Sequence, residues 1–193
     1  MTAQRVVGLL LVLAVTTGAC GSESGGQGTI QVAGSSVHFS SVDAMAEASF
    51  LIVVGTVIEV GDGVFESAPG LEDFLGTQFL KVTIEIEEVL KGDRLAGDRV
   101  SISWAGYDVA LDSTKGPQQI VEGQVPPESG NRNLWFLIDQ PTGLFIIAYE
   151  GRLKIDDGGK LRLANPVESG AADKIGEMTV AEVAELLSLE TGR

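Results

Sequence analysis

Val82-Thr83-Ile84-Glu85-Ile86-Glu87 is the stretch that decides the fold class of this chain, because apolar and polar side chains alternate along it without a break. Successive side chains of a β-strand point to opposite faces, so this pattern predicts a strand with one buried face and one solvated face. We expect that strand to span Gln78 to Leu90. The centre of the chain is therefore predicted to be β-structure.

Further strands are predicted on both sides of this stretch, separated by turns rich in Gly, Asp and Pro. The first, Phe50–Val60, is apolar at nearly every position and has Gly55 in its middle, which indicates a strand covered on both faces or sharply bent. The others are Arg99–Trp104, Asn133–Asp139, Leu144–Tyr149, Arg152–Ile155 and Lys160–Leu163.

Helices are predicted only at the two ends of this β-region. Residues Val42–Ser49 carry apolar side chains on one helical face, and Ser40 or Ser41 can cap that helix. A capping box, Thr179-Val180-Ala181-Glu182, predicts a C-terminal helix from about residue 179. Short strands with helices only at the ends favour a mainly β fold, a small closed or partly open β-barrel, over residues 41–193.

The first nineteen residues have the anatomy of a secretory signal. Arg5 supplies the charged start, Val6–Val15 form an apolar core, and small residues follow as far as Ala19. A ten-residue helix rises only about 15 Å, roughly half the hydrocarbon thickness of a bilayer. We therefore expect residues 1–19 to be removed on export and not to span the membrane.

The sole cysteine follows this segment in Thr17-Gly18-Ala19-Cys20, which resembles the lipobox of bacterial lipoproteins. The resemblance implies diacylglyceryl attachment to Cys20 and a protein anchored on the extracytoplasmic face of the cell membrane. The alternative is an ordinary signal peptide followed by a chance cysteine. Residues 20–40 are predicted to be a lipidated cysteine and a flexible tether, which a short strand at Ile30–Val32 would interrupt.

The charge of the mature chain excludes one class of partner. The sequence has 13 basic and 27 acidic residues, and removal of Arg5 with the signal leaves 12 minus 27, a net charge of −15. Such a surface repels nucleic acid. We expect the partners to be the membrane, through Cys20, and an envelope protein or a cell-wall component.

The last predicted hairpin allows an inference about its loop. Leu153 and Ile155 share a face with Leu161 and Leu163 only if the loop has an odd number of residues, three or five. The opposite face then carries four cations, which either form an ordinary solvated surface or bind an anionic partner. These candidate anion-facing residues are Arg152, Lys154, Lys160 and Arg162.

Three further stretches resemble a known family: Val53–Val57, Val82–Asp93 and Leu134–Ile138. Their pattern is similar to the five-stranded OB barrel of netrin-like and metalloprotease-inhibitor-like domains. The resemblance implies a barrel with a non-catalytic binding role. The inhibitory mechanism does not carry over, because those inhibitors present a free N-terminal cysteine and are braced by disulfides, whereas Cys20 is predicted to be lipidated and has no second cysteine to pair with.

Residues for catalysis are scarce. His38 is the only histidine, so no second histidine or cysteine completes a zinc site, and the chain has no G-x-S-x-G elbow, phosphate loop or D-x-D-x-D-G calcium loop. The sequence predicts no catalytic residue, metal or cofactor. The alternative is a small hydrolase or metal-dependent envelope enzyme with a site of another kind.

Two long loops are predicted at one end of the barrel, at Gly61–Thr77 and Ala105–Arg132. Aromatic residues on such loops favour a binding role, and the alternative is that Phe65, Leu71, Phe74 and Leu75 of the first loop plug the barrel end. Because the tether is expected to reach the domain at the opposite end, we expect these loops to face away from the membrane. The candidate partner-binding residues in and beside them are Phe65, Phe74, Trp104, Tyr107 and Asp112.

Overall fold

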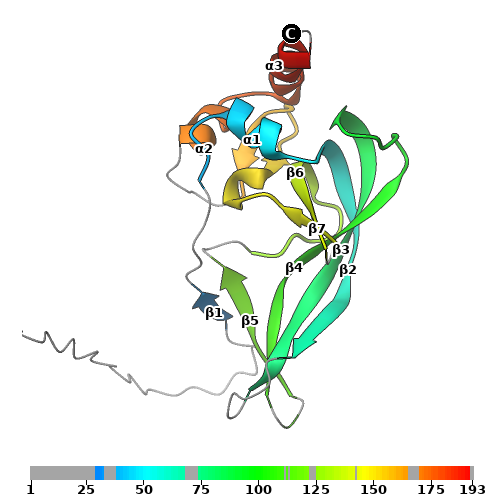
Figure 1. The fold of residues 1–193 in the computed structure, drawn as a ribbon, viewed down its shortest axis with the longest axis vertical. Coiled ribbons are helices and arrows are strands. Elements are labelled where there is room, and N and C mark those ends of the chain that lie inside the picture. Colours follow the sequence, from blue (N-terminus) through cyan, green and yellow to red (C-terminus); the bar gives the residue numbers. More distant parts are fainter. Residues whose placement is uncertain are drawn as a thin grey trace, which may run out of the picture.

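The computed structural model describes residues 29–32, 38–67, 74–110, 112, 114–121, 125–141, 143–164 and 170–191. Within them the fold is mainly β, as predicted, with nine strands in one sheet and helices packed at one end (Figure 1). The strands are β1 (Thr29–Val32), β2 (Leu51–Ser67), β3 (Phe74–Lys91), β4 (Arg99–Ala110), β5 (Lys115–Val121), β6 (Arg132–Gln140), β7 (Gly143–Ile146), β8 (Arg152–Ile155) and β9 (Leu161–Leu163). The helices are α1 (Val42–Ala48), α2 (Gly170–Ile175) and α3 (Val180–Thr191), with a 3-10 turn at Tyr149–Gly151.

Five of the strands form a ring. β2, β3 and β4 pair as consecutive antiparallel neighbours, and β6 pairs antiparallel with β2 on the other side. β7 folds back on β6 and meets β4 in parallel, where Leu144 lies opposite Ile102. The order around the ring is therefore β2-β3-β4-β7-β6 and back to β2.

The inside of the ring is filled by one hydrophobic core. Alternate residues of β3 and β4 point into it, as the period-two pattern of the central stretch predicts. Trp135 lies at its centre with no exposed surface and donates its indole N–H to the carbonyl of Gly55 at 3.3 Å. The buried residues of this core are Leu51, Val53, Val57, Leu80, Val82, Ile84, Ile86, Val100, Ile102, Trp104, Trp135 and Leu137.

A second core lies on the outer face of β2 and β6, where α1, α2 and α3 cover the sheet (Figure 1). Ile52 and Val54 point into this core, whereas Val53 points into the ring, so β2 is buried on both faces, as its sequence predicts. A Cβ on Gly55 would lie 2.6 Å from Ile84 Cγ2 and 2.7 Å from the carbonyl oxygen of Glu85. Glycine at this position therefore allows β3 to approach β2 closely.

The prediction of two long loops is wrong, because strands occupy most of Gly61–Thr77 and half of Ala105–Arg132. β2 runs to Ser67, β3 begins at Phe74, β4 runs to Ala110, and β5 occupies Lys115–Val121. Together with β1 they form an extension of the sheet beyond the ring, which we call the arm: residues 61–67, 74–79, 105–110, 115–121 and 29–32 (Figure 1). The two hairpins do share one end, since Phe74 lies opposite Ala110.

Bulges explain why the sequence pattern does not predict the strands of the arm. Register shifts interrupt the β2–β3 pairing between Asp62 and Phe65 and the β3–β4 pairing between Gln78 and Leu80. A Cβ on Gly106 would lie 1.9 Å from the carbonyl oxygen of Gln78, so only glycine fits at that crossing. The bulges break the period of two, and the glycines at them are typical of loops.

The short strand predicted in the tether is present as β1. It pairs in parallel with β5, with Thr29 opposite Gln118 and Val32 opposite Val121. The chain therefore meets the arm before it reaches α1, and the premise that the tether first joins the domain at the opposite end is wrong. The predicted signal segment and Cys20 lie outside the described residues.

The last hairpin has the predicted odd loop. Leu153 lies opposite Leu163 and Ile155 opposite Leu161, which fixes a five-residue loop, residues 156–160. Both predicted terminal helices are also present: the Ser41 hydroxyl accepts the Ala44 N–H at the start of α1, and the Thr179–Glu182 capping box begins α3. Within the described part of the chain, every helix is too short or too polar to cross a bilayer.

Candidate functional site

The arm brings two of the candidate binding residues onto one face. Phe65 of β2 and Tyr107 of β4 both lie directly opposite Gln78 of β3. Directly paired residues of neighbouring antiparallel strands share a face of the sheet. Tyr107 packs against the core inside the ring, so this face is continuous with the ring interior. We call it the inner face of the arm.

The inner face is concave. Lys115 Nζ lies 2.9 Å from Asp62 Oδ2, although β3 and β4 separate the strands that carry these residues. Three strand spacings in a flat sheet are about 14 Å, which is further than a lysine side chain extends. The sheet must therefore curl so that β5 approaches β2. The same ammonium lies 5.3 Å from the centre of the Tyr107 ring, so Tyr107 forms the floor beneath the ion pair.

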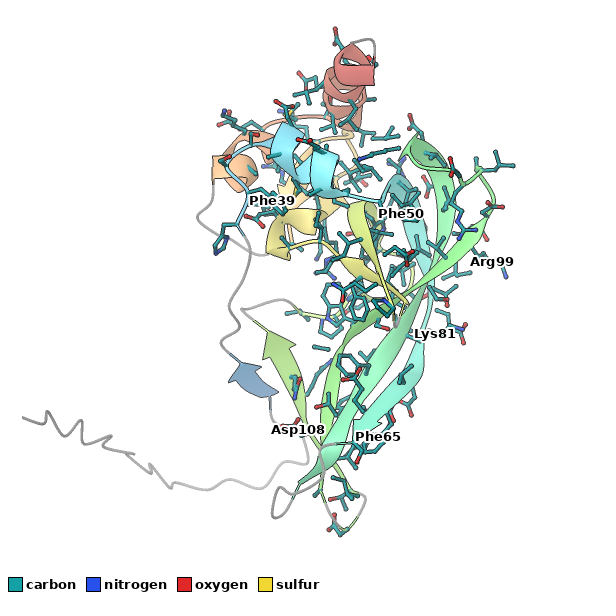
Figure 2. The ribbon with its side chains drawn as sticks, viewed as in Figure 1. Phe39, Phe50, Phe65, Lys81, Arg99 and Asp108 are labelled. Carbon is teal, nitrogen blue, oxygen red and sulfur yellow. The ribbon has the colours of Figure 1, made fainter. Side chains whose placement is uncertain are left out.

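The candidate aromatic residues differ in exposure. Phe65 is 42% exposed and lies on the arm, far from the helix-covered end that holds Phe39 and Phe50 (Figure 2). Tyr107 is half-buried, and Trp104 is a core residue. Trp104 is therefore part of the core inside the ring, whereas Phe65, one of the residues predicted either to bind a partner or to plug the barrel end, lies with Tyr107 beyond the ring on the inner face.

Two other candidates have different places. Phe74 begins β3 opposite Ala110, and its side chain is outside what the structure describes. Asp112 lies in the β4–β5 turn, where Thr114 donates its hydroxyl and its backbone N–H to Asp112 Oδ1. These two bonds lower the pKa of the Asp112 carboxyl, and they show that this residue shapes the turn.

Arg152 is not part of an exposed cationic face, and the prediction that groups it with three surface cations is wrong. It is 2% exposed, because β8 pairs with β6 so that Arg152 lies opposite Trp135 on the inside of the sheet. Its guanidinium carbon lies 4.7 Å from the centre of the Trp104 ring, and Nη2 donates to the Val125 carbonyl at 3.0 Å. Nε and Nη1 are buried without a hydrogen-bond partner.

The other three predicted cations are exposed, as expected, and sit on the last hairpin. Lys154 lies directly opposite Arg162, whose Nε is 3.5 Å from Asp156 Oδ2. Lys160 donates its backbone N–H to Asp156 Oδ1. This bond, the Gly158 N–H and Arg162 together hold the pKa of the Asp156 carboxyl below its ordinary value.

A cavity of about 690 Å³ lies beside this hairpin. Arg132 in its wall is already paired with Glu87 at 2.6 Å. Burial acts to raise the pKa of the Glu87 carboxyl, but hydrogen bonds from Thr56 and Arg132 outweigh it and lower that pKa. The lining residues are Gly130, Asn131, Arg132, Lys154, Ile155, Asp156, Asp157, Gly158 and Gly159.

One buried acid was missed by sequence reasoning. Glu150 has no exposed side-chain surface, its Oε1 lies 3.3 Å from His38 Nδ1, and its Oε2 is buried without a partner. No local signal marks Glu150 or Arg152, since their burial depends on how the 3-10 turn and β8 pack against distant segments. The side chain of His38 is 46% exposed.

Among the residues that the structure describes, no group of three or more His, Cys, Asp or Glu side chains is placed to hold a metal ion. The chain matches no family model and no curated protein. The case for a function therefore rests on the arm and on the residues around Arg152.

Proposed function

We propose that this protein is a lipid-anchored envelope module that binds an envelope protein or a cell-wall component on the inner face of its arm. One observation carries the proposal. Phe65 and Tyr107 lie on one concave face that extends beyond both hydrophobic cores, and Phe65 leaves much of its ring in solvent. Aromatic rings held on rigid strands supply contact area at low entropic cost, which is typical of binding surfaces.

The ring supports assignment of the domain to the OB-like barrels. Its five strands close with one parallel contact, between β4 and β7, while every other contact in the ring is antiparallel. A three-stranded meander closed by a later hairpin is the arrangement expected of a partly open Greek-key barrel. Such barrels are scaffolds that act through the surfaces attached to them, which agrees with a binding role.

The polar groups of the inner face favour binding over catalysis. Lys115 and Asp62 neutralise each other, and Gln78 Nε2 donates to the carbonyls of Gly63 and Phe79. Each of these groups already has a partner within the sheet. A general acid or base would instead need a titratable group directed at a substrate.

A lipid on Cys20 would keep the arm close to the membrane. Thr29, the first residue of β1, follows Cys20 by nine residues, a stretch that spans at most about 30 Å when fully extended. The partner would then lie in the layer next to the membrane. Replacing Cys20 by Ser is expected to move the protein from the membrane fraction to the soluble fraction, and a variant that stays with the membrane contradicts lipid anchoring.

The test of partner binding compares three forms of the full chain as bait for detergent-solubilised envelope and for purified cell wall. The forms are the wild type, Phe65→Ser with Tyr107→Ser, and Leu95→Ser as the matched control. Leu95 is 72% exposed in the β3–β4 turn, outside the arm. We expect a component captured by the wild type and by the Leu95 variant to be lost from the arm variant while circular dichroism shows all three folded. Equal capture by all three, or none by any, contradicts the proposal.

A further inference from the structure

Arg152 is a buried cation whose hydrogen-bonding capacity is largely unused. A guanidinium carries five N–H hydrogens, and the one on Nε and the two on Nη1 have no acceptor among the residues that the structure describes. Nη2 donates to the Val125 carbonyl, and one face of the group rests on Trp104. These two contacts fix the orientation of the guanidinium, and three of its five N–H hydrogens are buried without an acceptor in the described part of the chain.

No carboxylate in the described part of the chain is paired with this cation. The ion pairs among the described residues are His38–Glu150, Arg99–Glu85, Lys115–Asp62, Arg132–Glu87 and Arg162–Asp156. Glu150, two residues earlier in the chain, is the nearest acid in sequence, and it is directed to His38 instead.

The group remains charged in this setting. Burial lowers the pKa of Arg152 to about 10, which still leaves it protonated at neutral pH. A buried charge without a partner is costly, because it has lost water and gained no counter-ion. Buried ionisable groups with a perturbed pKa cluster at functional sites, and arginine is over-represented where a carboxylate or a phosphate is recognised.

We propose that Arg152 is the anion-binding group of a ligand site, and that its ligand carries a carboxylate or phosphate that accepts hydrogen bonds from Nε and Nη1. Arg152 lies on the inside of the sheet with Trp104, and the inner face of the arm continues from there through Tyr107. The ligand would place its anionic group on the guanidinium and its apolar or aromatic part toward Tyr107. Planar donors matched to carboxylate and phosphate geometry are the reason that arginine serves this purpose better than lysine.

This inference stands on the contacts of Arg152 alone and does not require a macromolecular partner on Phe65. The exposed cation Lys154, two residues along the same strand, supplies a matched control. If the anion merely neutralises surface charge, substitution of Lys154 should reduce its stabilising effect as much as substitution of Arg152 does. If the anion binds the guanidinium, only substitution of Arg152 should reduce that effect.

The experiment measures the melting temperature of the full chain in detergent at constant ionic strength, with inorganic phosphate or acetate replacing chloride. For the wild type and for Lys154→Met we expect a rise of about 2–4 °C as the anion saturates. For Arg152→Met we expect no anion-dependent rise, and in chloride a melting temperature no lower than that of the wild type. Phosphate and acetate are compared so that the preferred anionic group is identified.

Two outcomes would overturn the proposal: no anion-dependent rise in the wild type, or the same rise in Arg152→Met as in the wild type. Should the Met variant fail to fold, Arg152→Gln, which keeps most of the volume and an amide donor for the Val125 carbonyl, is measured in its place. Glu150→Gln tests the remaining internal counter-ion. If the wild type is insensitive to anions and Glu150→Gln becomes sensitive, Glu150 already neutralises Arg152 in solution and the proposal fails, whatever the capture experiment on Phe65 and Tyr107 gives.

Discussion

Lys115 Nζ lies 2.9 Å from both carboxylate oxygens of Asp62, although the two residues belong to strands that are not neighbours in the sheet. The pair joins β5 to β2 across the concave side of the arm and passes over the ring of Tyr107. Both side chains are about half exposed, so solvent screens their attraction. The pair is therefore a sign that the arm is curled, and it contributes little to the stability of the fold.

Removal of this pair is expected to change stability little. Lys115→Met should lower the free energy of unfolding by no more than about 1 kcal/mol, because exposed ion pairs contribute about that much or less. Urea denaturation followed by circular dichroism measures the change. A loss above about 2 kcal/mol would show that the curl of the arm depends on this single contact.

Two glycines of β2 offer a matched pair. In Gly55→Ala the new Cβ meets Ile84 and the backbone of Glu85, whereas nothing lies within 4 Å of a Cβ at Gly61. We expect Gly55→Ala to cost about 1–3 kcal/mol of stability through overpacking. Gly61→Ala should be neutral or stabilising by up to about 1 kcal/mol, since it reduces the entropy of the unfolded chain. Equal midpoints of urea denaturation for the two variants would contradict the close crossing of β2 and β3.

The largest loss of stability is expected for a substitution in the core inside the ring. Ile84 has no exposed surface, so Ile84→Ala should lower the free energy of unfolding by about 2–5 kcal/mol through lost burial and a residual cavity. Leu95→Ala, at a residue that is 72% exposed, should change it by less than about 0.5 kcal/mol. Thermal melts of both variants test whether Ile84 lies in the core inside the ring. A loss of stability in Ile84→Ala as small as that in Leu95→Ala would contradict this placement.

The capping box of α3 should make stability depend on pH. The backbone N–H and then the hydroxyl of Thr179 donate to Glu182, and these bonds lower the pKa of the carboxyl below its ordinary value of 4.5. A carboxylate with a lowered pKa stabilises the folded state above 4.5, and this contribution disappears as the pH falls through the folded-state pKa.

Glu182→Gln should therefore be less stable than the wild type at neutral pH, and the difference should vanish in acid. Thr179→Ala should cost about 1 kcal/mol at neutral pH, since it removes the cap. Urea midpoints measured across this range of pH check both variants. A Glu182→Gln deficit that is the same at both ends of the range would show that the charge of the carboxylate has no part in capping.

The sequence predicts those parts of the fold whose pattern is local. The alternation around Ile84 predicts β3. The need for Leu153 and Leu161 to share a face restricts the β8–β9 loop to an odd number of residues, and the loop in the structure has five. The capping residues Ser41 and Thr179 mark the starts of two helices correctly. Each of these inferences needs only neighbouring residues.

The arm and the Arg152 site depend on distant pairing, which a single sequence does not reveal. Gly63, Gly76 and Gly106 suggest loops, yet each lies in a strand of the arm, where a Cβ would come within 3 Å of another strand. Arg152 and Lys154 share a strand face by parity, but only Arg152 pairs with Trp135 and is enclosed. Lys154 lies opposite Asn133 of the same strand, β6, and is exposed, so the enclosure of a charged residue depends on the segments packed around it and not on the strand pairing alone.

The parallel pairing of β1 with β5 also determines how mechanical load would act on the molecule. A pull from the N-terminal side reaches the described part of the fold first at Thr29, and any component of that pull along the strand axis would load the hydrogen bonds between β1 and β5 together in shear. A partner gripped by Phe65 and Tyr107 would pull against the same sheet. Tension between membrane and partner would then pass through the arm, and neither the core inside the ring nor the core beneath the helices would bear that load.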